Sequence, residues 1–235
     1  MPLERILVVA AHPDDIDFAA AGSVATWTAQ GVDVSYCVVT DGDAGGFDPG
    51  VPRSEIPAIR QAEQTAAAAT VGVHDVQFLS YPDGRLQPSL ELRRDISRVI
   101  RRVRPQRVVS PSPVRDLKRI PASHPDHLAT GESAINAVYP DARNPFAFPE
   151  LLAEGLEPWT VDEIWLMATS HADVHVDITE EFDRKMQALR CHESQLADPA
   201  ATEERIRGWG TMVAQRMGLP EGRLAEGFLH VPASF

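Results

Sequence analysis

Cysteine, basic side chains and long apolar runs are all scarce in this sequence. Only two of its 235 residues are cysteines, Cys37 and Cys191. A pair of cysteines in a chain of this length cannot form the dense disulfide framework of a small secreted protein. Lysine and arginine number 22 against 34 aspartates and glutamates, which gives a formal net charge of −12. Because phosphate backbones bind to basic surfaces, this charge argues against nucleic acid as a partner.

Membrane insertion and secretion are also disfavoured by what is missing. No apolar run approaches the roughly 20 residues that a membrane-spanning helix requires. The first residues run directly into the apolar stretch 6–10, without the basic segment and longer apolar core of a secretory signal peptide. We therefore expect a cytoplasmic protein with no membrane partner. Hydrophobic residues make up 43% of the chain, enough to build a core without cross-links.

What the sequence does contain is a regular alternation of apolar runs and helical patterns. Strands are predicted at 6–10, 32–39, 76–79 and 107–109, with helices between them at 18–30, 57–71 and 90–103. The last of these helices is amphipathic, with arginines between its apolar positions. This alternation predicts an α/β fold with a mainly parallel sheet and right-handed crossovers.

The pattern loosens after Ser110. Two Pro-rich loops, 111–123 and 140–158, are predicted on either side of a helix at 125–138. Strands at 163–168 and 174–178 and helices at 180–192 and 202–217 are predicted for the remainder. We interpret residues 1–235 as one domain, with the C-terminal third, about 140–235, as a candidate small subdomain.

The first chemical motif is His-Pro-Asp-Asp at residues 12–15, directly after the first predicted strand. In sheets of this kind ligands bind beyond the carboxyl ends of the strands, so the motif occupies the usual place for chemistry. Taken by itself, a simple polar turn is an equally good interpretation, because Pro and Asp are common turn formers.

A second motif, His-Pro-Asp-His at residues 124–127, opens a predicted helix, with Pro125 at its first position. Solvent-exposed histidines are a reasonable interpretation of one such segment, but a weaker one for two, each at the mouth of the sheet. Two imidazoles and one carboxylate form a common catalytic zinc site that leaves a position open for water. We therefore predict His12, Asp15 and His127 as the metal ligands.

The remaining motif residues then have chemical tasks. Asp14 would lie beside the attacking water as general base, and His124 on the far side, near the oxyanion or the leaving amine. Either residue could protonate that amine. Zn²⁺ is the expected ion, and Fe²⁺ stays possible because imidazole and carboxylate ligands suit several divalent metals.

Residues 11–15, 40–42 (Thr-Asp-Gly) and 124–127 together resemble the PIG-L/LmbE-like family of N-acetylglucosaminyl deacetylases, which includes deacetylases of the mycothiol and bacillithiol type and related amidases. Weaker matches at 60–63, at 81–84 and at 185–195 extend the resemblance over roughly residues 5–196. It implies a Rossmann-like three-layer fold, one zinc ion, and hydrolysis of an N-acyl group on an amino sugar. It also implies a homo-oligomer.

By position, the resemblance implies the same ligands and the same base, and it places Asp126 behind His124 as an orienting group. It favours Arg60 and, more weakly, Asp83 as substrate-binding residues. We expect the Asp126 carboxylate to outweigh the helix N-terminus and to favour a charged His124. The family usually has Glu one or two places after the second Asp of the first motif, and Asp17 stands there as a shorter substitute.

The function predicted is zinc-dependent hydrolysis of the N-acetyl amide of an N-acetylglucosamine-type small molecule, giving acetate and a free amine. The group attached to the sugar cannot be deduced. One alternative is a metal-dependent phosphoesterase, in which Asp41, Asp43 and Asp83 supply further ligands. The other is a non-catalytic sugar- or nucleotide-binding module that uses the Gly-rich loop 41–46, although this loop lacks the G-x-G-x-x-G spacing.

Overall fold

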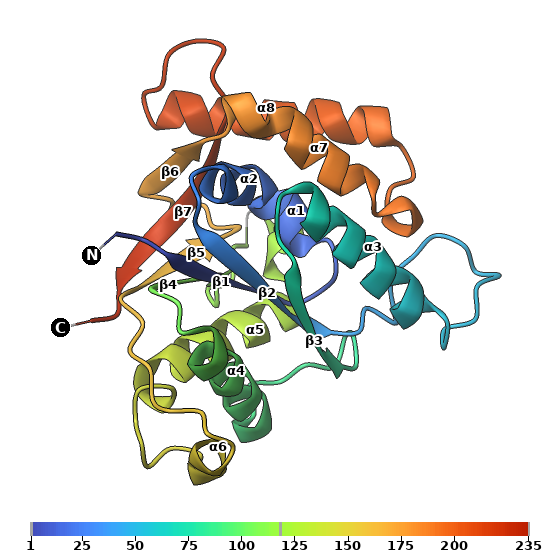
Figure 1. The fold of residues 1–235 in the computed structure, drawn as a ribbon. Coiled ribbons are helices and arrows are strands. Elements are labelled where there is room, and N and C mark those ends of the chain that lie inside the picture. The colour runs from blue at the N-terminus through green and yellow to red at the C-terminus, as the bar shows by residue number, and fades with distance from the viewer. Residues whose placement is uncertain (1, 118, 235) are drawn as a thin grey trace.

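A seven-stranded sheet runs through the middle of the computed structural model, which describes residues 2–117 and 119–234 (Figure 1). Its strands are β1 (Arg5–Ala10), β2 (Asp33–Thr40), β3 (Asp75–Tyr81), β4 (Arg107–Pro111), β5 (Glu163–Met167), β6 (Val174–Asp177) and β7 (Ala225–Pro232). Their order is β3-β2-β1-β4-β5-β7-β6. The pairs from β3 to β5 are parallel, whereas β7 is antiparallel to both of its neighbours. The prediction of an α/β fold with a mainly parallel sheet is thus confirmed.

Helices cover both faces of this sheet. They are α1 (Asp15–Ala19), α2 (Ala21–Ala29), α3 (Ile56–Thr70), α4 (Leu90–Val103), α5 (Pro125–Asn136), α6 (Pro149–Ala153), α7 (Phe182–Arg190) and α8 (Pro199–Arg216). In Figure 1, α1, α2, α3, α7 and α8 lie above the sheet, and α4, α5 and α6 lie below it, which gives three layers. None of the described helices combines the length and the apolar character needed to cross a membrane.

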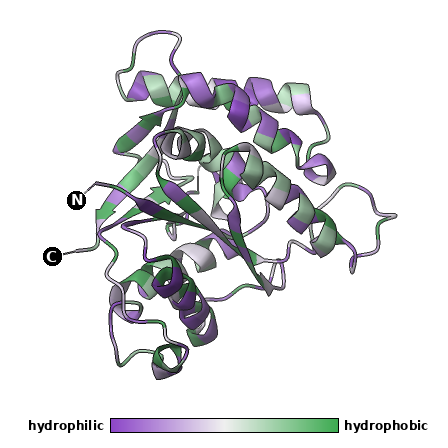
Figure 2. Ribbon diagram, viewed as in Figure 1, coloured by the Kyte–Doolittle hydropathy of each residue, from purple (hydrophilic) through white to green (hydrophobic). Residues whose placement is uncertain are grey.

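The central strand β1 divides its side chains between two cores. Ile6 and Val8 pack with Val24 of α2 on one face, whereas Leu7 packs with Leu92 of α4 on the other. This is the period of two that a strand imposes on its side chains. Both faces are covered, so β1 is a continuous apolar run, and Figure 2 shows its apolar colour between helices whose outer residues are hydrophilic.

The single helix predicted at 18–30 is in fact two helices, because Ala20 leaves the helical conformation with φ at −143°. A buried ion pair stabilises this break. Lys185 Nζ donates at 2.8 Å to the carbonyl oxygen of Phe18 at the end of α1. Glu226, which lies 2.6 Å from Lys185 Nζ, accepts at 2.7 Å from the N–H of Ser23 in the first turn of α2. The carbonyl and amide groups that lose their helical partners at the break thus form hydrogen bonds with side chains of α7 and β7.

Strand β7 has no counterpart among the sequence predictions. It forms by pairing with β5 and β6, which come many residues earlier in the chain. Glu226 and Gly227 also interrupt its apolar pattern. The loop predicted at 140–158 contains the short helix α6. The other predicted strands and helices lie close to the observed ones.

Parallel pairing places the carboxyl ends of β1, β2, β3 and β4 at one edge of the sheet. The segments that follow them begin with Ala11, Asp41, Pro82 and Ser112. This edge is where ligands bind in open α/β sheets. The fold therefore brings the first motif close to the loop that leads into the second.

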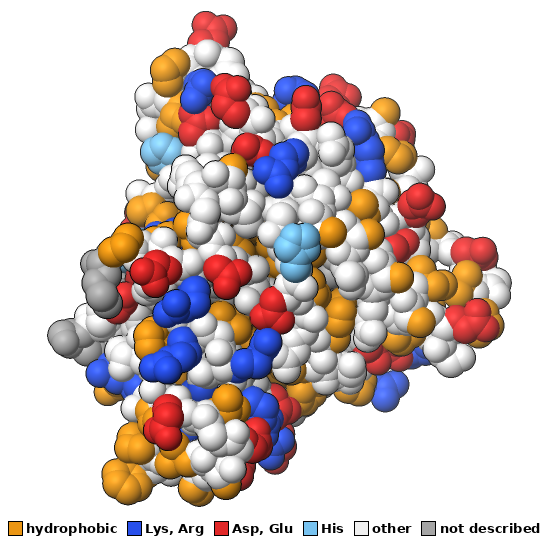
Figure 3. All heavy atoms as spheres, in the orientation of Figure 1, with side chains coloured by type: hydrophobic (Ala, Val, Ile, Leu, Met, Phe, Trp, Pro, Cys, Tyr) orange, Lys and Arg blue, Asp and Glu red, His pale blue; other side chains and the backbone are white. Residues whose placement is uncertain are grey.

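Arg101 on α4 fixes the Pro-rich loop to the sheet layer. Its side chain is 2% exposed. Its guanidinium donates to four backbone carbonyl oxygens at 2.9–3.1 Å, those of Asp141, Ala142, Asn144 and Ala147. Arg98 and Arg102 on the outer side of the same helix instead form ion pairs with Glu154 and Asp75. Figure 3 shows basic and acidic side chains gathered on the surface over α4.

Replacing Arg101 with Lys should lower the free energy of unfolding by about 2 kcal/mol or more, because one ammonium group cannot satisfy the carbonyls that the planar guanidinium reaches. Arg102→Lys is the matched control on the same helix. Its exposed pair with Asp75 should contribute less than about 1 kcal/mol. Urea denaturation at an unchanged m-value measures both. Equal losses in the two variants would contradict the role given to Arg101.

Candidate active site

The structure brings together the three residues predicted as metal ligands. His12 follows β1, Asp15 begins α1, and His127 lies in the first turn of α5. His12 Nδ1 lies 3.3 Å from His127 Nε2. Oxygens of the Asp15 carboxylate lie 3.4 Å from His12 Nδ1 and 3.0 Å from His127 Nε2. Two ring nitrogens and the two oxygens of one carboxylate therefore face one another.

This spacing fits a divalent ion. Ligand atoms held about 2.0–2.1 Å from a tetrahedral zinc ion are roughly 3.3 Å apart, and the three observed separations lie close to that value. Two imidazoles and a carboxylate are also a donor set that zinc accepts, with one position remaining for water or substrate. The residues therefore fit the metal that the sequence predicted.

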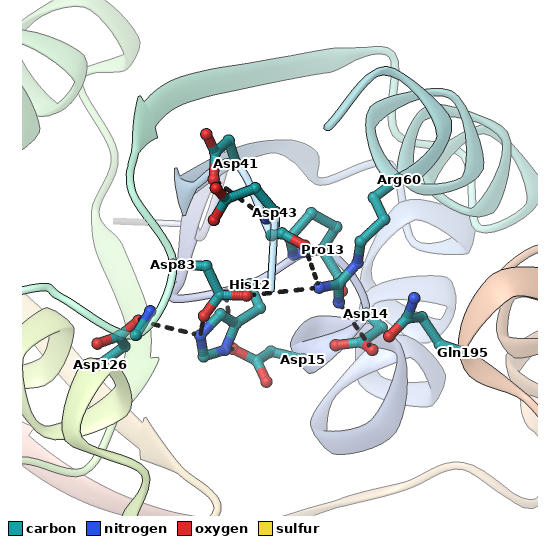
Figure 4. A network of polar contacts seen from close by, with 12 residues as sticks. His12, Pro13, Asp14, Asp15, Asp41, Asp43, Arg60, Asp83, Asp126 and Gln195 are labelled. Carbon is teal, nitrogen blue, oxygen red and sulfur yellow. Dashed lines mark hydrogen bonds and ion pairs between the residues drawn. The ribbon is translucent and has the colours of Figure 1, made fainter. Parts of the chain in front are cut away.

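The other nitrogen of each histidine ring already has a partner. His12 Nε2 lies 3.1 Å from Asp83 Oδ1 and 3.3 Å from Asp126 Oδ2 (Figure 4). His127 Nδ1 lies 3.4 Å from the carbonyl oxygen of Ala122. These acceptors favour the tautomers that carry the proton on the far nitrogen. When a metal ion replaces the ring proton, the nitrogens that face Asp15 are the ones left with lone pairs for ligation.

Carboxylates dominate the electrostatics of this group. Burial alone would lower the pKa of His12, but Asp15 and the hydrogen bonds to Asp126 and Asp83 raise it to about 12. Burial alone would raise the pKa of Asp15, but His127 and His12 hold it well below its usual value. The surroundings thus stabilise positive charge strongly, which is the property of a cation site.

A second group with ligand spacing contains His12, His124 and Asp126. It is a weaker candidate because the Asp126 oxygens accept from the N–H groups of Gly84 at 2.7 Å and Leu86 at 3.1 Å. Asp126 is also fully buried. Its carboxylate oxygens are therefore already occupied by His12 and by the backbone of the turn after β3.

Asp14 occupies a strained position next to the ligands. Its φ is 104°, in the left-handed region that non-glycine residues rarely adopt. Two residues one turn apart on α3, Arg60 and Gln64, hold it there, and Figure 4 shows Arg60 beside Asp14. Gln64 Oε1 accepts from the Asp14 N–H at 2.8 Å, and Arg60 donates to Asp14 Oδ2 at 3.2 Å. Burial raises the pKa of Asp14 to about 6, against the opposing charge of Arg60, which suits a general base near neutral pH.

Arg60 and Asp83 are both turned inward. Arg60 is 3% exposed, and besides Asp14 its guanidinium donates to the carbonyl oxygens of Pro13 and Gly42. A Cβ added at Gly42 would lie 2.6 Å from Arg60 Nη1, which explains a glycine in this loop without invoking a bound nucleotide. Asp83 is 8% exposed, and its carboxylate contacts His12 Nε2. These contacts indicate positioning tasks, and direct binding of substrate by either residue stays a prediction.

The pKa of His124 differs from the value that its sequence neighbours suggested. Burial and the nearby His12 lower its pKa, although the charge of Asp126 opposes them. The expectation that Asp126 keeps His124 charged is therefore wrong, because the Asp126 carboxylate lies against His12. Asp126 contacts His124 through its backbone N–H, which donates to His124 Nδ1 at 3.2 Å. This bond assigns the proton of a neutral His124 to Nε2.

A buried polar network behind Asp14 was largely missed by the sequence analysis. Gln64 Nε2 donates to Asp17 Oδ2 at 2.8 Å, and His192 Nε2 lies 2.8 Å from the same oxygen. All three side chains are fully buried. Asp17 had been singled out as a substitute for Glu, but His192 had been given no role. Gln64 could have been found from its position one helical turn after Arg60.

The aspartates of the phosphoesterase alternative are placed differently. Asp43 forms a bidentate pair with Arg53 at 2.7 and 2.9 Å, and Asp41 Oδ1 accepts from the Asp43 N–H at 3.2 Å. Among the described residues, both groups with ligand spacing contain His12, and neither includes Asp41, Asp43 or Asp83. The geometry thus favours one metal ion over two.

Comparison with known proteins adds three findings. Residues 7–138 match the sequence model of the PIG-L family, described as GlcNAc-PI de-N-acetylase. The chain is 32% identical to a diacetylchitobiose deacetylase of Thermococcus kodakarensis over 99% of its own length and 85% of the relative's. It is 31% identical to a probable N-acetyl-alpha-D-glucosaminyl L-malate deacetylase of Bacillus anthracis, with 82% of each chain covered.

A solved structure agrees with these relatives. The N,N'-diacetylchitobiose deacetylase of Pyrococcus horikoshii superposes with a TM-score of 0.90 at 31% identity, covering 98% of this chain and 85% of the other. On this evidence the chain belongs to the PIG-L/LmbE-like family and is an amide hydrolase.

Proposed function

We propose that this protein is a zinc-dependent deacetylase that hydrolyses the N-acetyl amide of an N-acetylglucosamine-type small molecule to acetate and a free amine. The observation that carries the proposal is the spacing of His12, Asp15 and His127, next to a carboxylate with the pKa of a general base. The substrate class is supported by the relatives, which are a diacetylchitobiose deacetylase and a probable N-acetyl-alpha-D-glucosaminyl L-malate deacetylase.

His12, Asp15 and His127 would hold the metal. When bound, a divalent ion supplies polarisation of the amide carbonyl and a lowered pKa for an attacking water. Asp14 accepts the proton of that water and later delivers it to the departing nitrogen, so that one carboxyl group serves both steps. Its carboxyl is kept in place by Arg60, while Gln64 fixes its backbone.

His124 would stabilise the oxyanion as a neutral hydrogen-bond donor. Its Nδ1 is occupied by the Asp126 N–H, so only Nε2–H can face the substrate. A neutral imidazole near a helix N-terminus can polarise a carbonyl without being protonated, a pattern known from other enzymes. This assignment leaves protonation of the amine to Asp14. The homo-oligomer, the cytoplasmic location and the C-terminal subdomain stay predictions.

Metal content together with amine release tests the proposal most directly. The zinc-loaded protein should contain one ion per chain and should release amine from N-acetylglucosamine, diacetylchitobiose or an N-acetylglucosaminyl malate. Asp15→Ala and His127→Ala should lose the ion, because each removes one of three protein ligands. Two ions per chain, with hydrolysis of a phosphate ester and of none of these amides, would support the phosphoesterase instead.

Asp14→Asn should retain the ion but lower kcat by roughly 10²–10⁴, the usual contribution of a general base. The amide is close in shape to the carboxylate, so KM should change little. Steady-state kinetics on metal-loaded protein measure the effect. Full activity in this variant would show that Asp14 is not the base.

Gln64→Leu should lower kcat by about tenfold or more while KM and metal content change little, because the strained backbone of Asp14 loses its acceptor. Gln61→Leu, one turn earlier on α3 and outside this network, is the matched control. A fall in metal content equal to the fall in kcat would indicate general unfolding of the site. It would contradict a specific positioning role for Gln64.

A further inference from the structure

A groove of about 610 Å³ begins at two of the proposed metal ligands and extends away from the polar motifs. Asp15 and His127 form its inner end. From there it runs between α8, the start of β7 and the loop at 119–122. Helix α8 packs along β7 at this end of the sheet (Figure 1). The volume of the groove lies within the range of small-molecule binding sites.

The walls of this groove are largely apolar. Phe18, Ile206, Trp209, Met212 and Val213 contribute the larger side chains. Trp209 is 42% exposed and Met212 is 56% exposed, although both are large apolar residues next to a candidate active site. Side chains of this kind at a cavity rim are typical of a surface that an apolar ligand covers.

Charged groups along the groove are few, and two of them neutralise each other. Lys185 and Glu226 line it but form an ion pair at 2.6 Å and are 2% and 7% exposed. Arg119 is exposed at the rim. Burying an unpaired charge or a sugar hydroxyl against such walls is unfavourable, whereas burying hydrocarbon is favourable. The groove therefore selects an apolar group.

The position of the groove identifies which part of the substrate reaches it. Asp14, which must lie near the amide nitrogen, does not line it, and neither does His124, which would lie near the oxygen. Of the three groups on the carbonyl carbon, the acyl carbon chain is the one that remains. An apolar group on the far side of the sugar is separated from that carbon by the nitrogen and the ring.

We propose that the groove binds the hydrocarbon chain of an N-acyl group longer than acetyl, so that the protein prefers amino sugars acylated with medium-length chains. The inference rests on the proposed function and deepens it. Water adds its oxygen to the carbonyl carbon, the C–N bond breaks, and a proton passes to the nitrogen. The products are a medium-chain carboxylic acid and the free amino sugar.

The test compares N-acetyl-, N-butanoyl- and N-hexanoylglucosamine with the zinc-loaded protein, and follows the primary amine with a fluorogenic reagent. We expect kcat/KM to rise along the series, by up to roughly fourfold for each methylene that becomes fully buried. A flat or falling series, with N-acetylglucosamine still hydrolysed, overturns the inference and leaves the proposed function standing. Hydrolysis of none of the three contradicts both.

Variants of the groove sharpen the comparison. Trp209→Ser and Met212→Ser should each lower the ratio of kcat/KM for the hexanoyl substrate to that for the acetyl substrate by about fivefold, since part of the apolar wall is lost. Both side chains are partly exposed, so folding should survive. Phe146→Ser, at a residue that is 89% exposed and outside the groove, is the matched control and should leave the ratio unchanged.

Two results would assign the groove to another occupant. One is a higher kcat/KM for a hexyl glycoside of N-acetylglucosamine than for the free sugar, with no such increase for the hexanoyl amide. This result would place an apolar aglycone in the groove. Sedimentation that shows an oligomer in the wild type and a monomer in Trp209→Ser, with an unchanged ratio, would make this face a contact between copies of the chain. Either result overturns the acyl-chain assignment.

Discussion

The whole site depends on how His12 is shared between two sets of carboxylates. Asp15 faces one ring nitrogen, and Asp83 and Asp126 face the other. Negative charge on both sides makes a cation at this place stable, and the partners on Nε2 fix the tautomer that leaves Nδ1 free. These residues follow β1, β3 and β4, so the arrangement exists only because parallel strands bring their carboxyl ends to one edge.

Asp14, the base of the proposed mechanism, is held from a different direction. Helix α3 supplies Arg60 and Gln64, and the buried Asp17 and His192 fix Gln64 in turn. A left-handed φ at Asp14 persists because the surrounding contacts over-determine it. The same α7 that ends near His192 also carries the lysine that separates α1 from α2. Helix α7 therefore contributes both to the stability of the fold and to the placement of Asp14.

The surroundings of the metal ligands divide by polarity. On one side lie the polar side chains of Asp14, His124 and the inward-turned Arg60. On the other side the groove along α8 offers hydrocarbon surface. A substrate with a polar amine half and an apolar acyl half matches this division, because each half is transferred to surroundings of its own kind.

The sequence by itself determined the alternating α/β pattern, the two His-Pro-Asp motifs at strand ends and the three residues proposed as metal ligands, because apolar periodicity and motif spacing are local properties. It could not give β7, whose partners are distant in the chain, or the pairing of Asp17 with His192, 175 residues apart. It also predicted the wrong direction for the pKa of His124. That pKa depends on burial and on which way the Asp126 carboxylate turns, and both are decided only when α5 packs against the sheet.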